Sequence, residues 1–273
     1  MPFEMDFPLS DWLRARSAAS RTDGIPYVIG VAGSVASGKS TFAGSLHAAL
    51  EGWHEHPRVQ SVATDGFLFP NRILAEREIT MRKGFPESYD FDAMREAVAG
   101  IKRGRRVTMP LYSHVTYDVD DENGLVVHKP DILILDGLHL ARIERGAPRL
   151  IDMLIYLDAD EAVIERWFTD RLVPLMQAGV DDSKSFYYAF RGMGPDERRA
   201  FAARVWQGIN LPNLRDHIVK DRDAADLVLH KAPDHRVTPS ARGECCASSS
   251  PKKSEEIGAG GRNRTDTPCR TRF

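Results

Sequence analysis

Short apolar runs bounded by polar or turn-forming residues alternate along this chain with segments of helical periodicity. The runs at 27–32, 58–63, 132–137, 150–157 and 225–230 predict buried strands. Helical spacing predicts helices at 41–50, 71–78, 91–103, 161–171 and from 195 to a break at 209–213. Strands that alternate with helices predict an α/β fold, a mostly parallel sheet with helices on both faces.

Two stretches depart from this alternation. Residues 107–118 alternate as a strand does, and Asp121-Glu122-Asn123-Gly124 has hairpin-turn composition ahead of 125–127. We therefore expect a β-hairpin that projects from the sheet. Residues 177–194 mix Gly, Asp, Ser and aromatics, which indicates a mobile lid.

The pattern also divides the chain. Residues 1–24 predict a short N-terminal helical segment that starts at Ser10, and residues 25–237 predict one domain. Residues 238–273 hold almost no aliphatic side chains, which predicts a disordered tail. Our hypothesis for this tail is a read-through or frame-shifted extension.

Composition excludes several classes of protein. The formal net charge of −2 over 273 residues gives no sign of nucleic-acid binding. No run approaches the roughly 20 apolar residues that span a bilayer, and no signal segment is visible, so we expect a soluble cytoplasmic protein without membrane contact. Cys245, Cys246 and Cys269 all lie in the tail, so the domain has neither a disulfide framework nor a Cys zinc site.

One motif carries phosphate chemistry. Residues 33–40, GSVASGKS, match G-x-x-x-x-G-K-[ST] between a predicted strand and a predicted helix, a context that disfavours a chance Gly-rich turn. Loop amides and the helix N-terminus would hold a polyphosphate, Lys39 would add a charge, and the Ser40 hydroxyl would bind Mg²⁺. The predicted nucleotide-binding residues are Gly33, Ser34, Val35, Ala36, Ser37, Gly38, Lys39, Ser40 and Thr41.

Two acids lie at the carboxyl ends of predicted strands, at the sheet edge where ligands gather in open α/β folds. Asp65 is a candidate base for an attacking hydroxyl, or a turn cap ahead of Gly66. Asp136 ends an apolar run and is a candidate metal ligand, or a turn former with Gly137. Position alone leaves both pairs of alternatives open.

Other polar positions are less specific. Tyr112, His114 and Tyr117 could line a pocket for a small polar ligand, although a lone His in a strand is more often structural. The basic patch 102–106 is interpreted as a solvated helix end, with ligand phosphates as the alternative. Arg166 and Arg171 point in different directions on their helix, so at least one can be a surface charge.

Several blocks together resemble the bacterial type I pantothenate kinases. They are GSVASGKST at 33–41, TDGFL at 64–68, KGFPESYD at 83–90, YSH at 112–114, YD at 117–118 and PDILIL at 130–135. The similarity runs from about Pro26 to Val237, and its middle blocks are far more specific than the phosphate loop, which many unrelated nucleotide-binding proteins share.

The resemblance implies a P-loop kinase domain that phosphorylates the primary hydroxyl of pantothenate with ATP and Mg²⁺, the first step towards coenzyme A. It implies phosphate and Mg²⁺ contacts for Lys39 and Ser40, and it favours Asp65 as the catalytic carboxylate. The residues that it adds are the lid-side phosphate clamp Arg171, the pantothenate-pocket residues Tyr112, His114 and Asn210, and the nucleotide-bordering Lys231 and His235.

The chain also departs from that family. Phe168 replaces a Tyr, and Leu172 and Leu175 replace Phe, so the acyl-chain side of the pocket is remodelled. Gly44 replaces a basic residue associated with coenzyme A feedback, which predicts weak feedback here. A homodimer is compatible with the sequence, which does not fix the oligomeric state.

Two rival functions remain at this point. One is a uridine kinase or phosphoribulokinase type of P-loop kinase acting on another hydroxyl acceptor. The other is a nucleotide-dependent switch without kinase activity, which would need no base such as Asp65.

Overall fold

The computed structural model describes residues 24–54, 57–144 and 148–240. A six-stranded sheet has the order β2-β5-β1-β6-β7-β8. Its strands are β1 (Tyr27–Gly33), β2 (Val59–Ala63), β5 (Ile132–Gly137), β6 (Met153–Asp158), β7 (Leu227–Lys231) and β8 (Val237–Pro239). Neighbours pair in parallel except β7 and β8, which are antiparallel. The predicted α/β class is confirmed.

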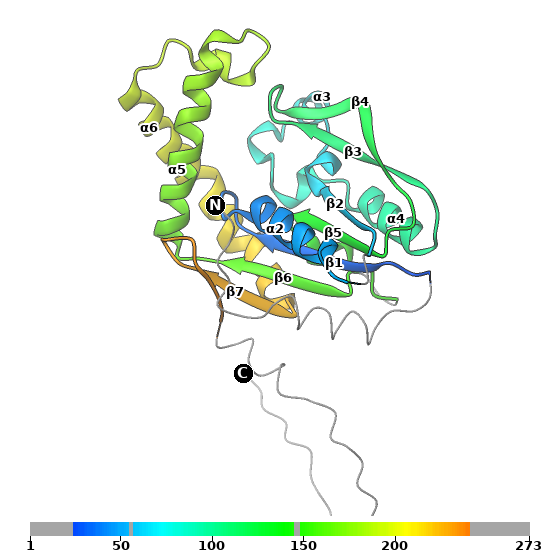
Figure 1. Cartoon of the computed structure of the whole chain (residues 1–273). Coiled ribbons are helices and arrows are strands. Elements are labelled where there is room, and N and C mark those ends of the chain that lie inside the picture. Colours follow the sequence, from blue (N-terminus) through cyan, green and yellow to red (C-terminus); the bar gives the residue numbers. More distant parts are fainter. Residues whose placement is uncertain (1–23, 55–56, 145–147, 241–273) are drawn as a thin grey trace, which may run out of the picture.

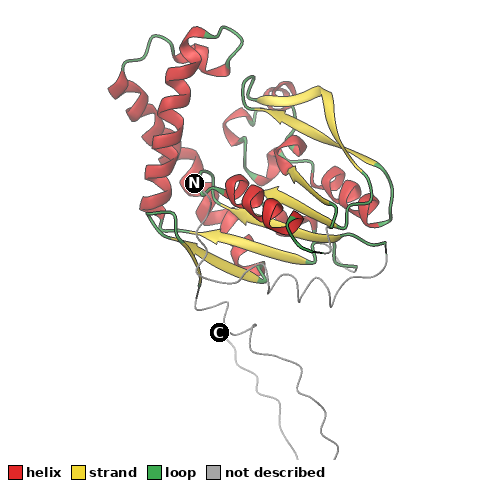
Figure 2. Ribbon diagram, in the orientation of Figure 1, coloured by secondary structure: helices red, strands yellow, loops and turns green. Residues whose placement is uncertain are grey.

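Helices cover both faces of this sheet (Figures 1 and 2). On β1, Ile29 and Val31 pack in one cluster with Phe42 of α2 (Lys39–Glu51). Val28 belongs to a second cluster with Met94 of α4 (Phe91–Lys102). Because successive side chains of a strand point to opposite faces, the continuous apolar run of β1 supplies both layers of the core.

The remaining elements stand above the carboxyl ends of the strands. In Figure 1, α5 (Glu161–Ala178) and α6 (Pro195–Val205) rise on one side of α2. The hairpin of β3 (Val107–Ser113) and β4 (Asp118–Val127), together with α3 (Asn71–Glu76), lies on the other side. In the described part of the chain, no helix is both long and apolar enough to cross a membrane.

The hairpin was predicted with its turn in the wrong place. The chain reverses at residues 114–117, and Tyr117 takes a positive φ of 56°. Residues 121–123 instead form a bulge, because Leu111 pairs with Asp120 whereas Pro110 pairs with Gly124. The Asp120 carboxylate accepts the backbone amides of the bulge and so satisfies them locally.

The predicted break at 209–213 is also wrong. Helical backbone continues from α6 through π-helical turns at Trp206–Asn210 and Leu214–Ile218, with α7 (Leu211–Asn213) between them and α8 (Val219–Ala224) after them. Pro212 cannot donate the usual amide hydrogen bond, and the wider π turns on both sides accommodate it.

Two predicted boundaries shift as well. Thr238 and Pro239 belong to β8, so the domain extends slightly past the predicted boundary at Val237. The N-terminal helix predicted from Ser10 and the tail after residue 240 lie outside the described residues.

Helix α5 continues to Ala178, beyond the predicted start of the lid at residue 177, and the lid residues 179–194 contain 3₁₀ turns at Gly179–Asp181 and Phe186–Phe190. The mobility of this lid stays a prediction.

Candidate functional site

The glycine-rich loop leads from β1 directly into α2. Gly38 has φ 91° at the helix N-cap, and Ala36 also has a positive φ of 63°. At Gly33 a Cβ would lie 2.7 Å from the carbonyl oxygen of Leu157, so only glycine fits there. This backbone leaves the first amides of α2 free to bind an anion.

Side chains of the loop fold back on its own carbonyls. Lys39 Nζ and Ser37 Oγ each donate a hydrogen bond of 2.8 Å to the carbonyl oxygen of Ser34. Burial lowers the pKa of Lys39, and the charges of Asp65 and Asp136 oppose that shift. The buried Ser34 hydroxyl has no partner within the described residues. An anionic ligand in the loop would give the Lys39 ammonium and the Ser34 hydroxyl a better partner.

Asp136 lies at the end of β5, beside the start of α2. Its pairing with Val31 brings the carboxylate next to the loop, where Ser40 donates a hydrogen bond to it. Burial raises the pKa of Asp136, and Ser40 and Lys39 counteract that shift. A hydroxyl and a carboxylate side by side are oxygen ligands of the kind that Mg²⁺ prefers, so these residues fit that ion.

Asp65 follows β2 in a 3₁₀ turn at Thr64–Phe67 and is half-buried. Its Oδ1 accepts a hydrogen bond of 3.1 Å from the hydroxyl of Tyr89. The Asp65 charge favours protonated Lys39 on one side, and it raises the pKa of Tyr112 and Tyr117 on the other. The carboxylate thus lies between the phosphate loop and the rings of the hairpin.

Those rings cluster at the tip of the hairpin. The centroid of Tyr112 lies 5.2 Å from that of His114 and 5.9 Å from that of Tyr117. Lys83 Nζ lies 5.0 Å from the Tyr112 centroid and 4.6 Å from that of Tyr117, and donates to Asn71 Oδ1 and to the carbonyl of Tyr117. Burial lowers the pKa of Lys83 to about 8.

Lys83 was not among the predicted site residues. Its position depends on a loop of Gly and Pro that the sequence leaves without a defined direction. The only signal was its place in a block shared with related kinases.

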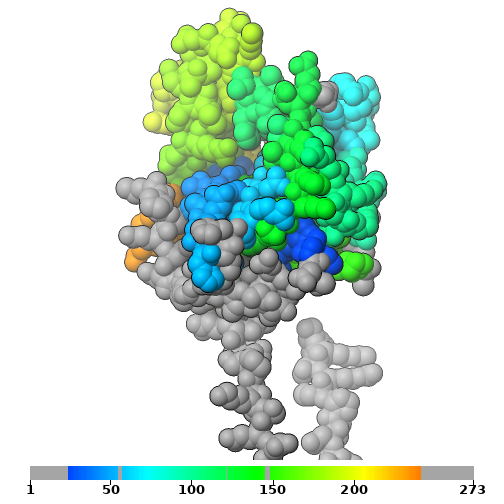
Figure 3. Space-filling model, turned by 45° about the vertical axis from the view of Figure 1, so that its right-hand side comes forward, coloured from blue at the N-terminus to red at the C-terminus, as the bar shows by residue number. Residues whose placement is uncertain are grey.

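The lid touches this cluster from the side of α5. Phe186 stacks on Tyr117 with centroids 4.6 Å apart, and its amide donates to the carbonyl of Val115 at 2.8 Å. In Figure 3 the lid and the hairpin lie next to each other above α2. Arg171 is exposed on α5, and its charge affects the pKa of Lys39, Tyr117 and Tyr187. Arg166 lies instead near His235.

A second basic position supports the loop from β7. Lys231 is 5% exposed and donates to the carbonyl of Ser37 at 2.9 Å. Its Nζ lies 4.4 Å from the centroid of Trp167, and the ring of His235 stacks on the same indole at 5.0 Å. Burial lowers the pKa of Lys231 to about 8. Lys231, His235 and the unpredicted Trp167 therefore lie together beside the phosphate loop.

Asn210 lies at the end of the first π turn. Its buried Nδ2 finds no acceptor among the described residues, which is uncommon for a buried amide. Asn213, one turn later, donates to the carbonyl of Gly84 at 2.7 Å. This helical stretch therefore contacts the segment that carries Lys83.

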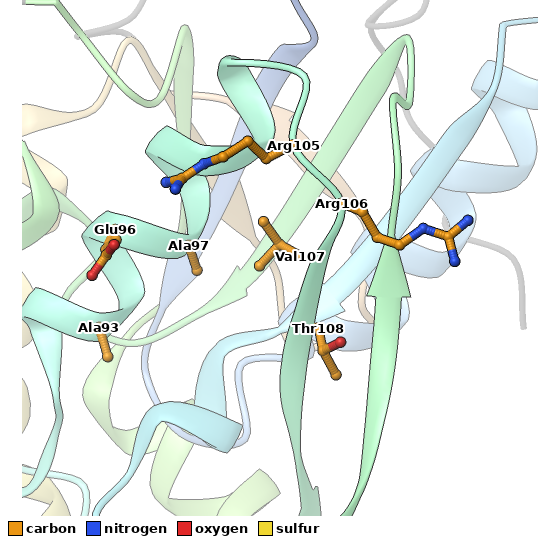
Figure 4. A pocket seen from close by; sticks show the side chains of 7 residues that line it. All are labelled: Ala93, Glu96, Ala97, Arg105, Arg106, Val107 and Thr108. Atoms are coloured by element: carbon orange, nitrogen blue, oxygen red, sulfur yellow. The ribbon is translucent and has the colours of Figure 1, made fainter.

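The basic patch after α4 is remote from the phosphate loop. Lys102 pairs with Asp152 at 2.7 Å, and Asp152 also accepts the amide of Val28 at the start of β1. The patch therefore lies at the opposite end of the strands, where Arg105 and Arg106 border a hollow of about 390 Å³ (Figure 4). In that view their side chains point to opposite sides. The alternative that this patch binds the phosphates at the loop is wrong.

Comparisons with known proteins agree with this geometry. The profile of the Phosphoribulokinase / Uridine kinase family matches residues 28–171. A pantothenate kinase of Sorangium cellulosum is 47% identical over 218 residues, 78% of this chain and 71% of the relative. A pantothenate kinase of Streptomyces coelicolor is 44% identical over 224 residues, covering 78% and 68%.

A solved structure confirms the fold. A putative fructose transport system kinase from Silicibacter sp. TM1040 superposes with a TM-score of 0.60 at 25% identity. The alignment covers 80% of this chain and 93% of that one.

Proposed function

The chain belongs to the pantothenate kinases within the phosphoribulokinase/uridine kinase family, and we propose that it transfers the γ-phosphoryl group of ATP to the primary hydroxyl of pantothenate. The observation that carries this proposal is the position of Asp65, whose charge acts on Lys39 of the phosphate loop and on Tyr112 and Tyr117 of the hairpin. A base for an acceptor hydroxyl belongs at that junction.

Each group of side chains in the site has a separate role in the proposed reaction. Loop amides and Lys39 bind the phosphates, and Arg171 adds a charge from the lid side. Asp65 accepts the proton of the attacking hydroxyl while Tyr89 holds the carboxylate in place. Tyr112, His114 and the unpartnered amide of Asn210 supply polar contacts for the acceptor, and Lys231 and His235 border the nucleotide.

Mg²⁺ would be held by Ser40 and Asp136, which are hydrogen-bonded to each other. When bound, the ion neutralises charge on the phosphate oxygens. Its ligand pair lies beside a hollow of about 150 Å³ that Gly44, Ser61 and Ala63 also line.

We further propose that coenzyme A inhibits this enzyme only weakly. Gly44 lies on α2, one turn after Ser40, at the family position that carries a cation. A Cβ built there meets no atom of the described residues within 4 Å, so the place of the missing side chain is open in this part of the structure. A charge-assisted contact to the inhibitor's phosphates is absent there.

A second candidate function is phosphorylation of a different hydroxyl acceptor. The family profile that matches this chain also describes uridine kinases and phosphoribulokinases. Phe168 stands where familiar pantothenate kinases carry Tyr, and Leu172 on the same helix stands where they carry Phe, so this side of the pocket is remodelled in a way that supports a different acceptor.

The decisive experiment is a steady-state assay of ATP turnover with a panel of acceptors. We expect ADP release that depends on pantothenate and yields a phosphorylated product with the mass of 4′-phosphopantothenate. Turnover with uridine or a pentose phosphate but not with pantothenate would support the second candidate. Nucleotide binding without acceptor-dependent turnover would contradict both.

A further inference from the structure

A buried imidazole lies against the ring of Tyr89, and none of the proposed steps uses it. His139 is 0% exposed, follows β5 three residues after Asp136, and has a positive φ of 59°. Its ring meets the rings of Tyr89, Phe91 and His217 edge to face. A fully buried polar ring in a left-handed backbone conformation is costly unless a contact compensates for it.

That contact is the carbonyl of Gly84. Nε2 of His139 lies 3.0 Å from this oxygen, and because a carbonyl only accepts, Nε2 carries the proton. Nδ1 is then a bare acceptor without a partner in the described structure. Burial lowers the pKa of His139 to about 4, so the ring is neutral near pH 7. The imidazole therefore works as a fixed donor.

The turn that carries His139 is itself held rigidly. The carboxylate of Asp221, 1% exposed on α8, accepts the amides of Leu140 and Ala141 at 3.0 and 3.1 Å. Asn213, from the same helical stretch, gives the Gly84 carbonyl its second donor at 2.7 Å. The end of β5, the C-terminal helices and Gly84 are therefore joined by buried hydrogen bonds.

Gly84 begins the segment 84–89, which leads into the site. Lys83, just before it, reaches the hairpin rings, and Tyr89 at its end donates to Asp65. The His139 ring contacts this segment at both ends, through the Gly84 carbonyl and the ring of Tyr89. Its backbone has φ 89° at Gly84 and a short 3₁₀ turn at Pro86–Ser88, whose hydrogen bonds are local, so the place of the segment in the site depends on contacts from outside it as well.

We propose that His139 is a positioning residue for phosphoryl transfer, which fixes segment 84–89 so that Asp65 and Lys83 keep their positions relative to the hairpin rings. This proposal rests on the proposed kinase function. In this proposal His139 contacts neither phosphate nor acceptor directly. Its effect reaches the reacting groups through Gly84 and Tyr89, and a small misplacement of such groups costs catalysis severely.

The test compares His139→Ala with His139→Asn in the full chain. Asn tolerates a left-handed backbone and keeps a short amide donor, whereas Ala removes the donor and the ring. We expect Ala to lower kcat about tenfold or more and Asn to restore most of it, with the Kd for ATP changed less than about twofold.

Amide hydrogen exchange of the peptide 83–90 in the free enzyme gives a readout without substrate. We expect exchange about tenfold faster in His139→Ala and near wild-type exchange in His139→Asn. The control is Val59→Ala, a buried site in the α2-side core, which should lower the melting temperature and leave exchange of 83–90 and kcat unchanged. If His139→Ala does not fold, Asn213→Ala removes the other donor and should accelerate the same peptide.

The two proposals fail in different ways. Wild-type enzyme that does not phosphorylate pantothenate would overturn the proposed function, while the exchange experiment would still decide the role of His139. Unchanged exchange together with kcat within about twofold of wild type in His139→Ala would overturn the positioning role.

Discussion

Replacing Asp65 with Asn tests the central assignment of the site. Asn keeps the shape of the side chain and an oxygen that can accept the Tyr89 hydroxyl, which lies 3.1 Å from Asp65 Oδ1. That neutral hydrogen bond is worth roughly 0.5–1.5 kcal/mol and largely survives, so the free energy of unfolding should fall by less than about 1 kcal/mol. The change therefore removes a base and a charge, and little else.

The loss in rate follows from those two terms. A positioned general base contributes about 10²–10⁴ in rate, and we expect kcat to fall about 10²–10³-fold, or roughly 2.7–4 kcal/mol. ATP affinity should change little, because Asp136 and Asp221 still favour the charged form of Lys39. A base acts on the acceptor and not on the nucleotide.

The assay is pantothenate-dependent ADP release, combined with calorimetric titration of ATP. Asp131→Asn is a matched control: it makes the same chemical change in an acid that pairs with Arg58 at 3.0 Å, at the opposite end of the strands. An exposed pair of this kind contributes about 0–1 kcal/mol to stability and nothing to the site. The reasoning is refuted if Asp65→Asn keeps kcat within about threefold of wild type, or if ATP affinity collapses while kcat is preserved.

Three further predictions concern the loop, feedback and pH. Lys39→Met should abolish measurable transfer, because a positioned charge in a phosphoryl-transfer site is worth several kcal/mol; near-normal turnover would overturn the loop assignment. Gly44→Arg should strengthen coenzyme A inhibition about ten- to hundredfold, from a contact of roughly 1.5–3 kcal/mol in open space, and an unchanged inhibition constant would contradict this. His139 has its folded-state pKa lowered from 6.5 to about 4, so the unfolded chain binds its proton first and stability is lost as pH falls below about 6.5. Between about pH 7 and 4.5, urea denaturation should show that the free energy of unfolding of the wild type falls by roughly 2–3 kcal/mol relative to that of His139→Asn; a constant difference would refute this. The pKa of Asp221 is raised to about 6, so this group stabilises the fold as pH falls, and because both variants contain it, its contribution cancels in the comparison.

The sequence predicted correctly those strands and helix starts that depend on neighbouring residues alone. The run 27–32 became β1 because it is apolar on both faces, and α4 begins after Asp90, whose carboxylate accepts the amide of Ala93 at 2.9 Å. The hairpin turn was misplaced because Asp121-Glu122-Asn123-Gly124 has the composition of a turn and of a bulge alike. The helical stretch across Pro212 was missed because π turns leave no mark on hydrophobic periodicity.

For the site, the sequence identified groups that follow strands and missed those that tertiary contacts place. Asp65 and Asp136 could be predicted because each ends an apolar run, and such ends meet at one edge of a parallel sheet. His139 and Lys83 could not, because they depend on which loop packs against which strand end. A lone His beside a buried strand has no sequence feature that distinguishes a positioning donor from an ordinary core residue.

The hairpin and the lid lie outside the central sheet, and this arrangement affects the expected specificity for the acceptor. The phosphate loop is built on the central sheet, whose fold this chain shares with the kinase from Silicibacter. The proposed acceptor side consists of the hairpin tip and the lid, which meet where the Phe186 amide donates to the Val115 carbonyl. Phe168 is buried against Trp206, whereas Leu175 is 39% exposed, and both lie on the helix that carries the lid. Because these segments lie outside the sheet, we expect substitutions in them to change the preference for the acceptor while the nucleotide affinity of the phosphate loop stays the same.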